Sequence, residues 1–290
     1  MSPVRPLATI AVALLAASAL WAGCGGDGGT GGGADGDAVE LSRWLPADAG
    51  SYSAVDLMTF RDDLDLADDA DATGEDLAPY AAPGLAPVFA AGDQDLIAAL
   101  EPGALTAIAS SGGSARPDGA GLSAMATSAD TGEIGSALGD MGFREEAGVL
   151  VREGSSVAFK LEDGLIFAAT DPAALRSLPE EPRDQSPSQL LEDLDAPFVY
   201  IVSVPGSGCI RSQAATAEPG GDGEIAWLVD GGADADAVDA QDSSAIEVGE
   251  PDVDGDLVTI PVSYVEGGAG SGSGVAARDA LGSFQVSYDC

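Results

Sequence analysis

The stretch that decides the fold is Val157-Ala-Phe-Lys-Leu-Glu-Asp-Gly-Leu-Ile-Phe-Ala-Ala169. Before its centre, apolar side chains alternate with other residues from Val157 to Leu161, which is the period of a strand with one buried face. Asp163-Gly164 is a dipeptide typical of the tight primed turns of β-hairpins. The return segment, Leu165 to Ala169, is apolar throughout. The stretch therefore predicts an antiparallel hairpin whose second strand is the more deeply buried.

Helix signals lie on both sides of this hairpin in the sequence. Asp130 and Glu133 have the spacing of a capping box, apolar residues follow at helical spacing, and Gly142 is a typical stop. Asp171-Pro172 and Ser186-Pro187 each read as an N-cap followed by proline at the first helical position. These patterns predict one amphipathic helix before the hairpin and two short helices after it.

The last hundred residues repeat this alternation of strand and helix. We expect a hairpin through Asp254-Gly255, together with two further strands and two helices, in the order βαββαβ of a ferredoxin-like module. Its other elements are strands Ile225 to Val229 and Phe284 to Tyr288, and helices Asp234 to Ala240 and Val275 to Leu281. A further strand, Phe198 to Val204, is expected before this module. The fold class predicted is α+β, with antiparallel sheets and helices on one face. Residues 39–182 and 183–290 would be two modules, which the element order suggests are a diverged ferredoxin-like pair.

The first residues have the features of an export signal. Arg5 precedes an apolar run from Leu7 to Trp21, and small residues lead to a cysteine in Ala22-Gly23-Cys24. The run is shorter than the roughly 20 residues that span a bilayer. Ala22-Gly23-Cys24 resembles the bacterial lipobox, which implies a signal peptide over residues 1–23 and acylation of Cys24. Residues 24–38 would then be the acylated cysteine and a Gly-rich tether.

Two other interpretations of this segment stay open, an ordinary secretory signal cleaved near Ala17-Ser18-Ala19 and an uncleaved anchor. The cysteine count favours the lipoprotein, because the chain has three cysteines and exported proteins seldom leave one unpaired. If Cys24 is acylated, Cys209 and Cys290 are expected to form a disulfide in an oxidising compartment.

Composition excludes one class of partner. The chain carries 49 acidic residues against 11 basic ones, for a formal charge of −38, and such a surface repels nucleic acids. The acidity is explained either by the solubility of an exported protein from a GC-rich genome or by adaptation to high salt, where charge repulsion is screened. Weak, diffuse binding of Ca²⁺ is compatible with both, and so is a cationic partner.

The sequence contains no motif that identifies a catalytic residue, a metal site or a cofactor-binding site. The chain contains no histidine, which excludes Ser-His-Asp catalysis and histidine-ligated zinc. Asp252-Val253-Asp254-Gly255-Asp256 looks like the start of a calcium loop, but the glycine and the twelfth residue are wrong for an EF-hand, so we expect a hairpin turn. No pair of carboxylates stands out as a glycosidase pair.

Leu45-Pro46-Ala47-Asp48, followed by the segment from Tyr52 to Leu57, resembles the opening of uncharacterised envelope proteins of GC-rich Gram-positive bacteria. In those proteins an aromatic-aliphatic strand follows a Leu-Pro-Ala-Asp turn. The resemblance implies an exported α+β ectodomain whose activity is not established.

These observations predict a lipoprotein held at the extracytoplasmic face of the cell membrane through Cys24. Its ectodomain is expected to be a binding or structural module of the cell envelope, with an envelope component or a cationic molecule as partner. The alternatives are an extracellular hydrolase that uses carboxylates and a calcium-dependent adhesion module. A pocket holding perturbed carboxylates would favour the hydrolase.

Overall fold

The computed structural model describes residues 38–59, 94–114, 121–194, 196–204, 208–218, 221–240, 246–264 and 286–290. The predicted signal peptide (1–23), Cys24 with nearly all of the tether, and the predicted helix at 275–281 lie outside the described residues. Within these ranges, no helix is long and apolar enough to cross a bilayer.

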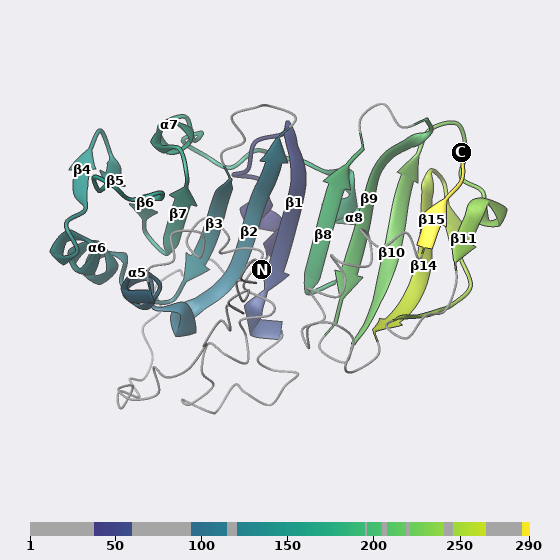
Figure 1. Ribbon diagram of the computed structural model, residues 1–290, viewed down its shortest axis with the longest axis horizontal. Coiled ribbons are helices and arrows are strands. Elements are labelled where there is room, and N and C mark those ends of the chain that lie inside the picture. Colours follow the sequence, from purple (N-terminus) through teal and green to yellow (C-terminus); the bar gives the residue numbers. More distant parts are fainter. Residues whose placement is uncertain are drawn as a thin grey trace, which may run out of the picture.

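Two antiparallel sheets make up the β structure of the described residues. The larger contains thirteen strands: β1 (Ala49–Asp56), β2 (Leu105–Ser114), β3 (Leu122–Thr127), β4 (Arg144–Glu146), β5 (Val149–Val151), β6 (Ala158–Glu162), β7 (Leu165–Ala169), β8 (Phe198–Ser203), β9 (Ile210–Ala217), β10 (Asp222–Val229), β12 (Ile246–Val248), β13 (Asp252–Asp254) and β14 (Leu257–Tyr264). Its spatial order is β12-β14-β10-β9-β8-β1-β2-β3-β7-β6-β5-β4, with β13 also paired to β14. Figure 1 shows this sheet running across the width of the molecule. The smaller sheet pairs β11 (Val238–Ala240) with β15 (Val286–Tyr288).

The hairpin predicted at the deciding stretch is confirmed. Strands β6 and β7 pair with Glu162 opposite Leu165, and β7 is buried at four of its five positions. The turn itself is not a primed one, because only Gly164 of its two central residues has a positive φ (70°), whereas primed turns need a positive φ at the first position. The Gly164 carbonyl accepts a hydrogen bond from Thr127 N at 3.0 Å, which ties the turn to the end of β3.

The centre of the large sheet is the antiparallel pair β1 and β8, aligned from Ser51 opposite Val202 to Val55 opposite Phe198. Outward from this pair, one side runs β1-β2-β3-β7-β6 and the other runs β8-β9-β10-β14-β13, so the same connectivity occurs twice. In both halves a two-residue turn joins the last two strands, at 163–164 and at 255–256. Strands on either side of the predicted module boundary thus belong to one sheet.

The ferredoxin-like arrangement is not seen in the described residues. In the predicted C-terminal module the last strand would pair with the first, but β10 pairs with β9 and β14, while β15 pairs with β11 in the small sheet. What the structure does have is the coarser class, an α+β chain dominated by antiparallel sheet.

The prediction that helices cover only one face is wrong. Successive residues of β1 and of β10 alternate between two separate core clusters, so the clusters lie on opposite faces of the sheet. Helices α5 (Gln94–Ala99) and α6 (Thr131–Asp140) pack into one cluster, and α1 (Ala38–Ser42), α7 (Pro172–Arg176) and α8 (Gln189–Asp193) into the other. All six residues of β3 are buried, and a strand of this kind needs cover on both sides.

The helix signals are confirmed at two sites and displaced at a third. The Asp130 carboxylate accepts hydrogen bonds from Gly132 N and Glu133 N at the start of α6, and Asp171 accepts one from Ala173 N at the start of α7. Helix α8 is capped at Ser188, without a side-chain cap bond, rather than at Ser186.

The helix expected at Asp234 to Ala240 is also wrong. A single 3-10 turn, Ala235–Ala237, is followed directly by strand β11. The turn is capped by the Asp234 side chain, which accepts from Asp236 N at 3.0 Å. Val238 then starts the pairing with β15.

Candidate functional site

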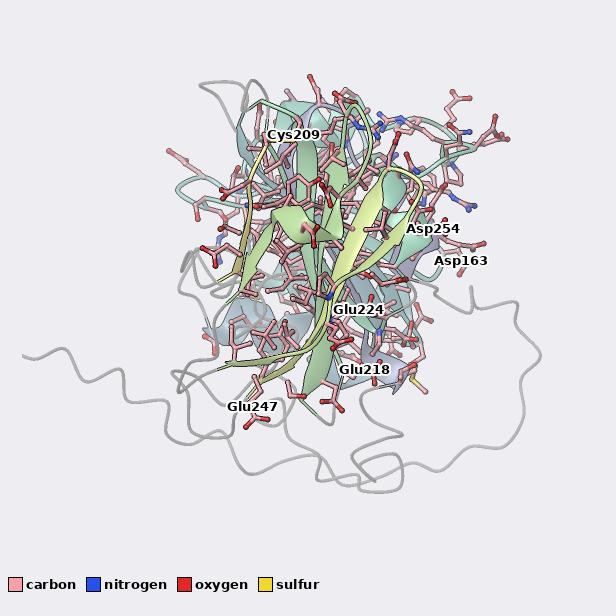
Figure 2. All side chains as sticks on the ribbon, turned by 90° about the vertical axis from the view of Figure 1, so that its right-hand side faces the viewer. Asp163, Cys209, Glu218, Glu224, Glu247 and Asp254 are labelled. Carbon is pink, nitrogen blue, oxygen red and sulfur yellow. A yellow bond between two sulfur atoms is a disulfide. The ribbon has the colours of Figure 1, made fainter. Side chains whose placement is uncertain are left out.

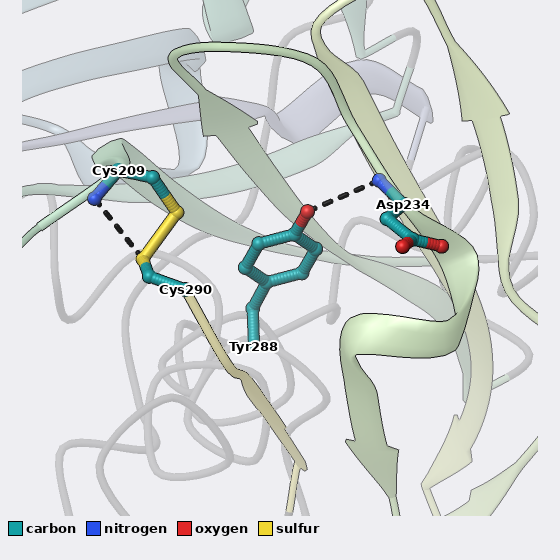
Figure 3. The surroundings of a disulfide bond; sticks show 4 residues. All are labelled: Cys209, Asp234, Tyr288 and Cys290. Atoms are coloured by element: carbon teal, nitrogen blue, oxygen red, sulfur yellow. Dashed lines mark hydrogen bonds between the residues drawn. A yellow bond between two sulfur atoms is a disulfide. The ribbon is translucent and has the colours of Figure 1, made fainter.

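The two cysteines that the cysteine count predicts to be paired, Cys209 and Cys290, do lie together. Cys209 and Cys290 form a disulfide with their Cα atoms 5.6 Å apart, across a sequence separation of 81 residues. The Cys209 N–H also donates to Cys290 Sγ at 3.0 Å (Figure 3). Cys290 is exposed and Cys209 is partly exposed, so solvent reaches the bridge. The predicted disulfide is therefore confirmed.

The bridge fastens the last strand of the chain. In the small sheet, β15 pairs with β11 from Val238 opposite Tyr288 to Ala240 opposite Val286. One more backbone bond, from Asp289 N to the Ala237 carbonyl at 2.8 Å, extends this pairing towards Cys290. Figure 1 places the C-terminus at the end of the molecule where β11 lies.

An aromatic pair packs beneath this strand. The Tyr288 ring lies 6.1 Å from the Trp227 ring, centroid to centroid, and Trp227 is 1% exposed. The Tyr288 hydroxyl accepts a hydrogen bond from Asp234 N at 3.1 Å (Figure 3). Tyr288 thus joins β15 both to the core of the large sheet and to the turn before β11.

Arg211 forms an ion-pair clamp close to the bridge. Its guanidinium pairs with Asp230 at 3.0 Å and with Asp256 at 3.2 Å, and it donates to the Val229 carbonyl. Asp230 N in turn donates to the Cys209 carbonyl at 2.7 Å. Because these side chains are largely exposed, each pair contributes little energy, but the clamp links the start of β9 to both ends of the β10–β14 connection.

A second organised region lies at the Leu-Pro-Ala-Asp turn. The Tyr52 hydroxyl donates to the Pro46 carbonyl at 2.8 Å and accepts from Ala49 N at 3.0 Å, so one buried ring closes the turn that precedes β1. Burial raises the pKa of Tyr52, partly offset by the hydrogen bond from Ala49. Strand β1 begins at Ala49, directly after this turn.

Beside this turn the surface is hollowed over about 420 Å³. The hollow is lined by Ala47 and by residues 183–187, and the Arg183 guanidinium donates to the Leu45 carbonyl. Ser186 is held in place because its hydroxyl bonds that of Ser42 at 2.9 Å and its N–H donates to Glu192. The hollow is open and holds one cationic and one anionic side chain, Arg183 and Asp184.

Acidic side chains project from the C-terminal half of the molecule. In Figure 2, Glu218 and Glu247 lie at the end opposite Cys209, with Glu224 and Asp254 between them. Asp252 to Asp254 form strand β13, paired with β14, so the predicted hairpin is confirmed there. In the part of the chain that the structure describes, no group of three or more Cys, Asp or Glu residues is arranged to hold a metal ion.

Of the predicted site residues, Cys209 and Cys290 are brought together, and Cys24 lies outside the described residues. Sequence reasoning missed the Arg211 clamp and the Tyr288–Trp227 contact. The only signal for the clamp was the scarcity of cations, which makes any arginine among so many carboxylates a candidate ion-pair centre.

Comparison with known proteins gives a distant structural likeness only. No family model matches the sequence, and no curated protein matches it. Among solved structures, crystal form I of a protein called TP0453 is 10% identical at a TM-score of 0.44, covering 86% of this chain and 98% of that one. Crystal form IV of TP0453 is 8% identical at a TM-score of 0.47, covering 84% of this chain and 96% of that one. Sequence identities and TM-scores this low do not indicate a function.

Proposed function

We propose that this chain is an exported lipoprotein whose acidic ectodomain serves as a binding or structural module at the extracytoplasmic face of the membrane. The observation that supports this most is the Cys209–Cys290 disulfide, open to solvent at its Cys290 end. Structural disulfides form and persist in oxidising compartments and are rare where glutathione and thioredoxin keep thiols reduced.

The same bridge bears on the anchor. With Cys209 and Cys290 paired, Cys24 is the one remaining cysteine of the three, and it stands in the Ala22-Gly23-Cys24 sequence that resembles a lipobox. Acylation would use this thiol and attach the ectodomain through the Gly-rich tether. Two or more acyl chains give stable membrane attachment, whereas one gives only marginal binding.

The experiment is a comparison of Cys24→Ser with the matched control Thr30→Ser, which changes the tether but leaves the thiol. In a bacterium that processes lipoproteins, Cys24→Ser should appear in the medium or as an unprocessed precursor, and Thr30→Ser should stay in the membrane fraction. If Cys24→Ser keeps both the membrane location and the mature mass of the parent chain, the proposal is wrong.

The partner that fits this surface is cationic. A formal charge of −38 attracts positively charged peptides or polyamines, and the attraction weakens as salt shortens the screening length to about 3 Å at 1 M. A fluorescent oligolysine should bind the full chain at low salt and be released at high salt, while an oligoglutamate of equal length should not bind. Binding of oligolysine that ignores salt, or no binding at low salt, would contradict a cationic partner.

A further inference from the structure

We propose that the Cys209–Cys290 disulfide is a redox latch. Its reduction frees strand β15 and uncovers the apolar surface around Trp227, while the thirteen-stranded sheet stays folded. The inference does not depend on the lipid anchor, because it concerns only described residues at the C-terminal end of the ectodomain.

Apart from the bridge, β15 is held by a short backbone pairing, by the packing of Val286 and Tyr288, and by the hydrogen bond of the Tyr288 hydroxyl. It forms no ladder with the large sheet, and its pairing with β11 covers only three residues of each strand. An isolated two-stranded ribbon is marginally stable in water, and a chain terminus frays unless something ties it down. The disulfide, two residues beyond Tyr288, is the covalent tie.

The other end of the bridge, at Cys209, is firmly placed. Cys209 directly precedes β9, which is paired on both sides, with β8 and with β10. Its carbonyl accepts from Asp230 N at 2.7 Å, which fixes it to the end of β10. When the bridge opens, the Cys290 side is therefore the one that moves.

Strand β15 covers part of the apolar core around Trp227. Val286 and Tyr288 are each 8% exposed and belong to the same core cluster as Trp227 and Val229. Release of β15 removes the Tyr288 ring from Trp227 and breaks the hydrogen bond to Asp234 N. An aromatic and aliphatic surface on one face of the sheet then meets water.

The large sheet does not need β15 to stay together. Strand β10 pairs with β14 from Asp222 opposite Ser263 to Leu228 opposite Leu257, and with β9 along its other edge. Neither ladder includes a residue of β15, so opening the latch breaks no hydrogen bond of the large sheet. Local release of one strand is thus separable from global unfolding.

The opening reaction is a thiol–disulfide exchange with a dithiol reductant. A thiolate of the reductant attacks one sulfur of the bridge, which breaks the S–S bond, forms a mixed disulfide and releases the other cysteine as a thiolate. The second thiolate of the reductant then attacks the reductant's own sulfur in the mixed disulfide and displaces the remaining protein thiolate, and both cysteines take up a proton. Two electrons pass to the Cys209–Cys290 pair, which becomes two thiols, and the reductant becomes a disulfide. The exposed position of Cys290 gives the attacking thiolate access.

Trp227 is the reporter. In the full chain carrying Trp21→Phe and Trp44→Phe, so that Trp227 is the only indole, we measure acrylamide quenching and far-UV circular dichroism before and after reduction with dithiothreitol. Reduction should raise the quenching constant several-fold and shift the emission to the red, with the circular dichroism nearly unchanged. Reoxidation should reverse both fluorescence changes.

Two variants separate the latch from a general loss of structure. Cys209→Ser with Cys290→Ser should show the high quenching without reductant, and Tyr288→Ala should show it in the oxidised chain. If Trp227 stays shielded after complete reduction, or if reduction abolishes the circular dichroism of the sheet, the latch is refuted. Reduction of the parent chain gives this answer even where the double variant fails to fold.

Discussion

Tyr52 shows how one side chain fixes a local structure. Its ring is 2% exposed, and its hydroxyl bonds both the Pro46 carbonyl and Ala49 N across the turn that leads into β1. We expect Tyr52→Phe to lower the free energy of unfolding by about 1–2 kcal/mol, because both backbone groups lose a partner at a partly buried position. Urea unfolding measures this. Tyr200→Phe, on the neighbouring strand β8, is the matched control, and an equal loss in the control would contradict the role given to the Tyr52 hydroxyl.

Tyr264 predicts a pH dependence. Burial raises its pKa above the ordinary value of 10.0, and its hydroxyl donates to the Thr216 carbonyl at 2.9 Å. Above pH 10 the unfolded chain releases this proton while the folded chain keeps it, so stability present below pH 10 falls as the pH rises further. Tyr52 has a shift of the same sign. Urea unfolding at rising alkaline pH should show the fall, with a shallower slope in Tyr264→Phe, and an unchanged slope in that variant would refute the assignment.

Residues whose roles follow from counting or from local spacing were predictable. The Cys209–Cys290 bridge follows from three cysteines, one of which stands in a sequence that resembles a lipobox, and the Asp130 cap follows from its neighbours in the chain. The contact of Tyr288 with Trp227 and the pairing of Arg211 with Asp230 and Asp256 were not predictable. Those partners meet only once distant strands have paired, and a single sequence gives no signal of that.

At the scale of one element, α6 depends on its N-cap. Asp130 Oδ1 accepts from Gly132 N at 2.7 Å and from Glu133 N at 3.4 Å, which satisfies donors that have no partner within the helix. Asp130→Ala should cost about 1 kcal/mol in the free energy of unfolding. Ser188→Ala is the matched control, because the Ser188 side chain makes no cap bond to α8. A loss at Ser188 as large as that at Asp130 would show that the cap bond is not the cause.

Elements rich in small residues escaped prediction. Strand β2 reads Leu-Thr-Ala-Ile-Ala-Ser-Ser-Gly-Gly-Ser, which has little of the β-branched and aromatic content typical of strands. It forms because β1 and β3 pair with its two edges. In the middle of this region Ser53 lies opposite Ser110, and Ser110 opposite Ser123, whose hydroxyls bond each other at 2.8 Å. A segment with side chains this small forms a strand here because a strand pairs with each of its two edges.

For the whole molecule, the class was predictable and the topology was not. Hairpins and helix caps are local signals, so an antiparallel α+β chain follows from the sequence. The continuity of the large sheet depends on β1 pairing with β8, which joins residues far apart in the chain. The same order of strands occurs on both sides of the β1–β8 pair. This repeat is visible only in the structure, because the two halves have a two-residue turn at the same place but no shared pattern of side chains.

The net charge sets a prediction for the molecule as a whole. If the charge of −38 reflects a saline habitat, the melting temperature should rise by several degrees between low salt and about 1 M NaCl, as repulsion is screened. A flat response favours the composition of a GC-rich genome. CaCl₂ at equal ionic strength is the control, since a rise beyond that in NaCl would indicate specific binding of Ca²⁺.

Export followed by acylation of Cys24 is tested most directly by the intact mass of the chain extracted from the membranes of cells that express it. The predicted result is a chain that begins at Cys24, carries the mass of a diacylglyceryl group, and has Cys209 joined to Cys290. A chain found outside the membrane fraction with a free thiol at Cys24, or one that retains residues 1–23, would contradict it.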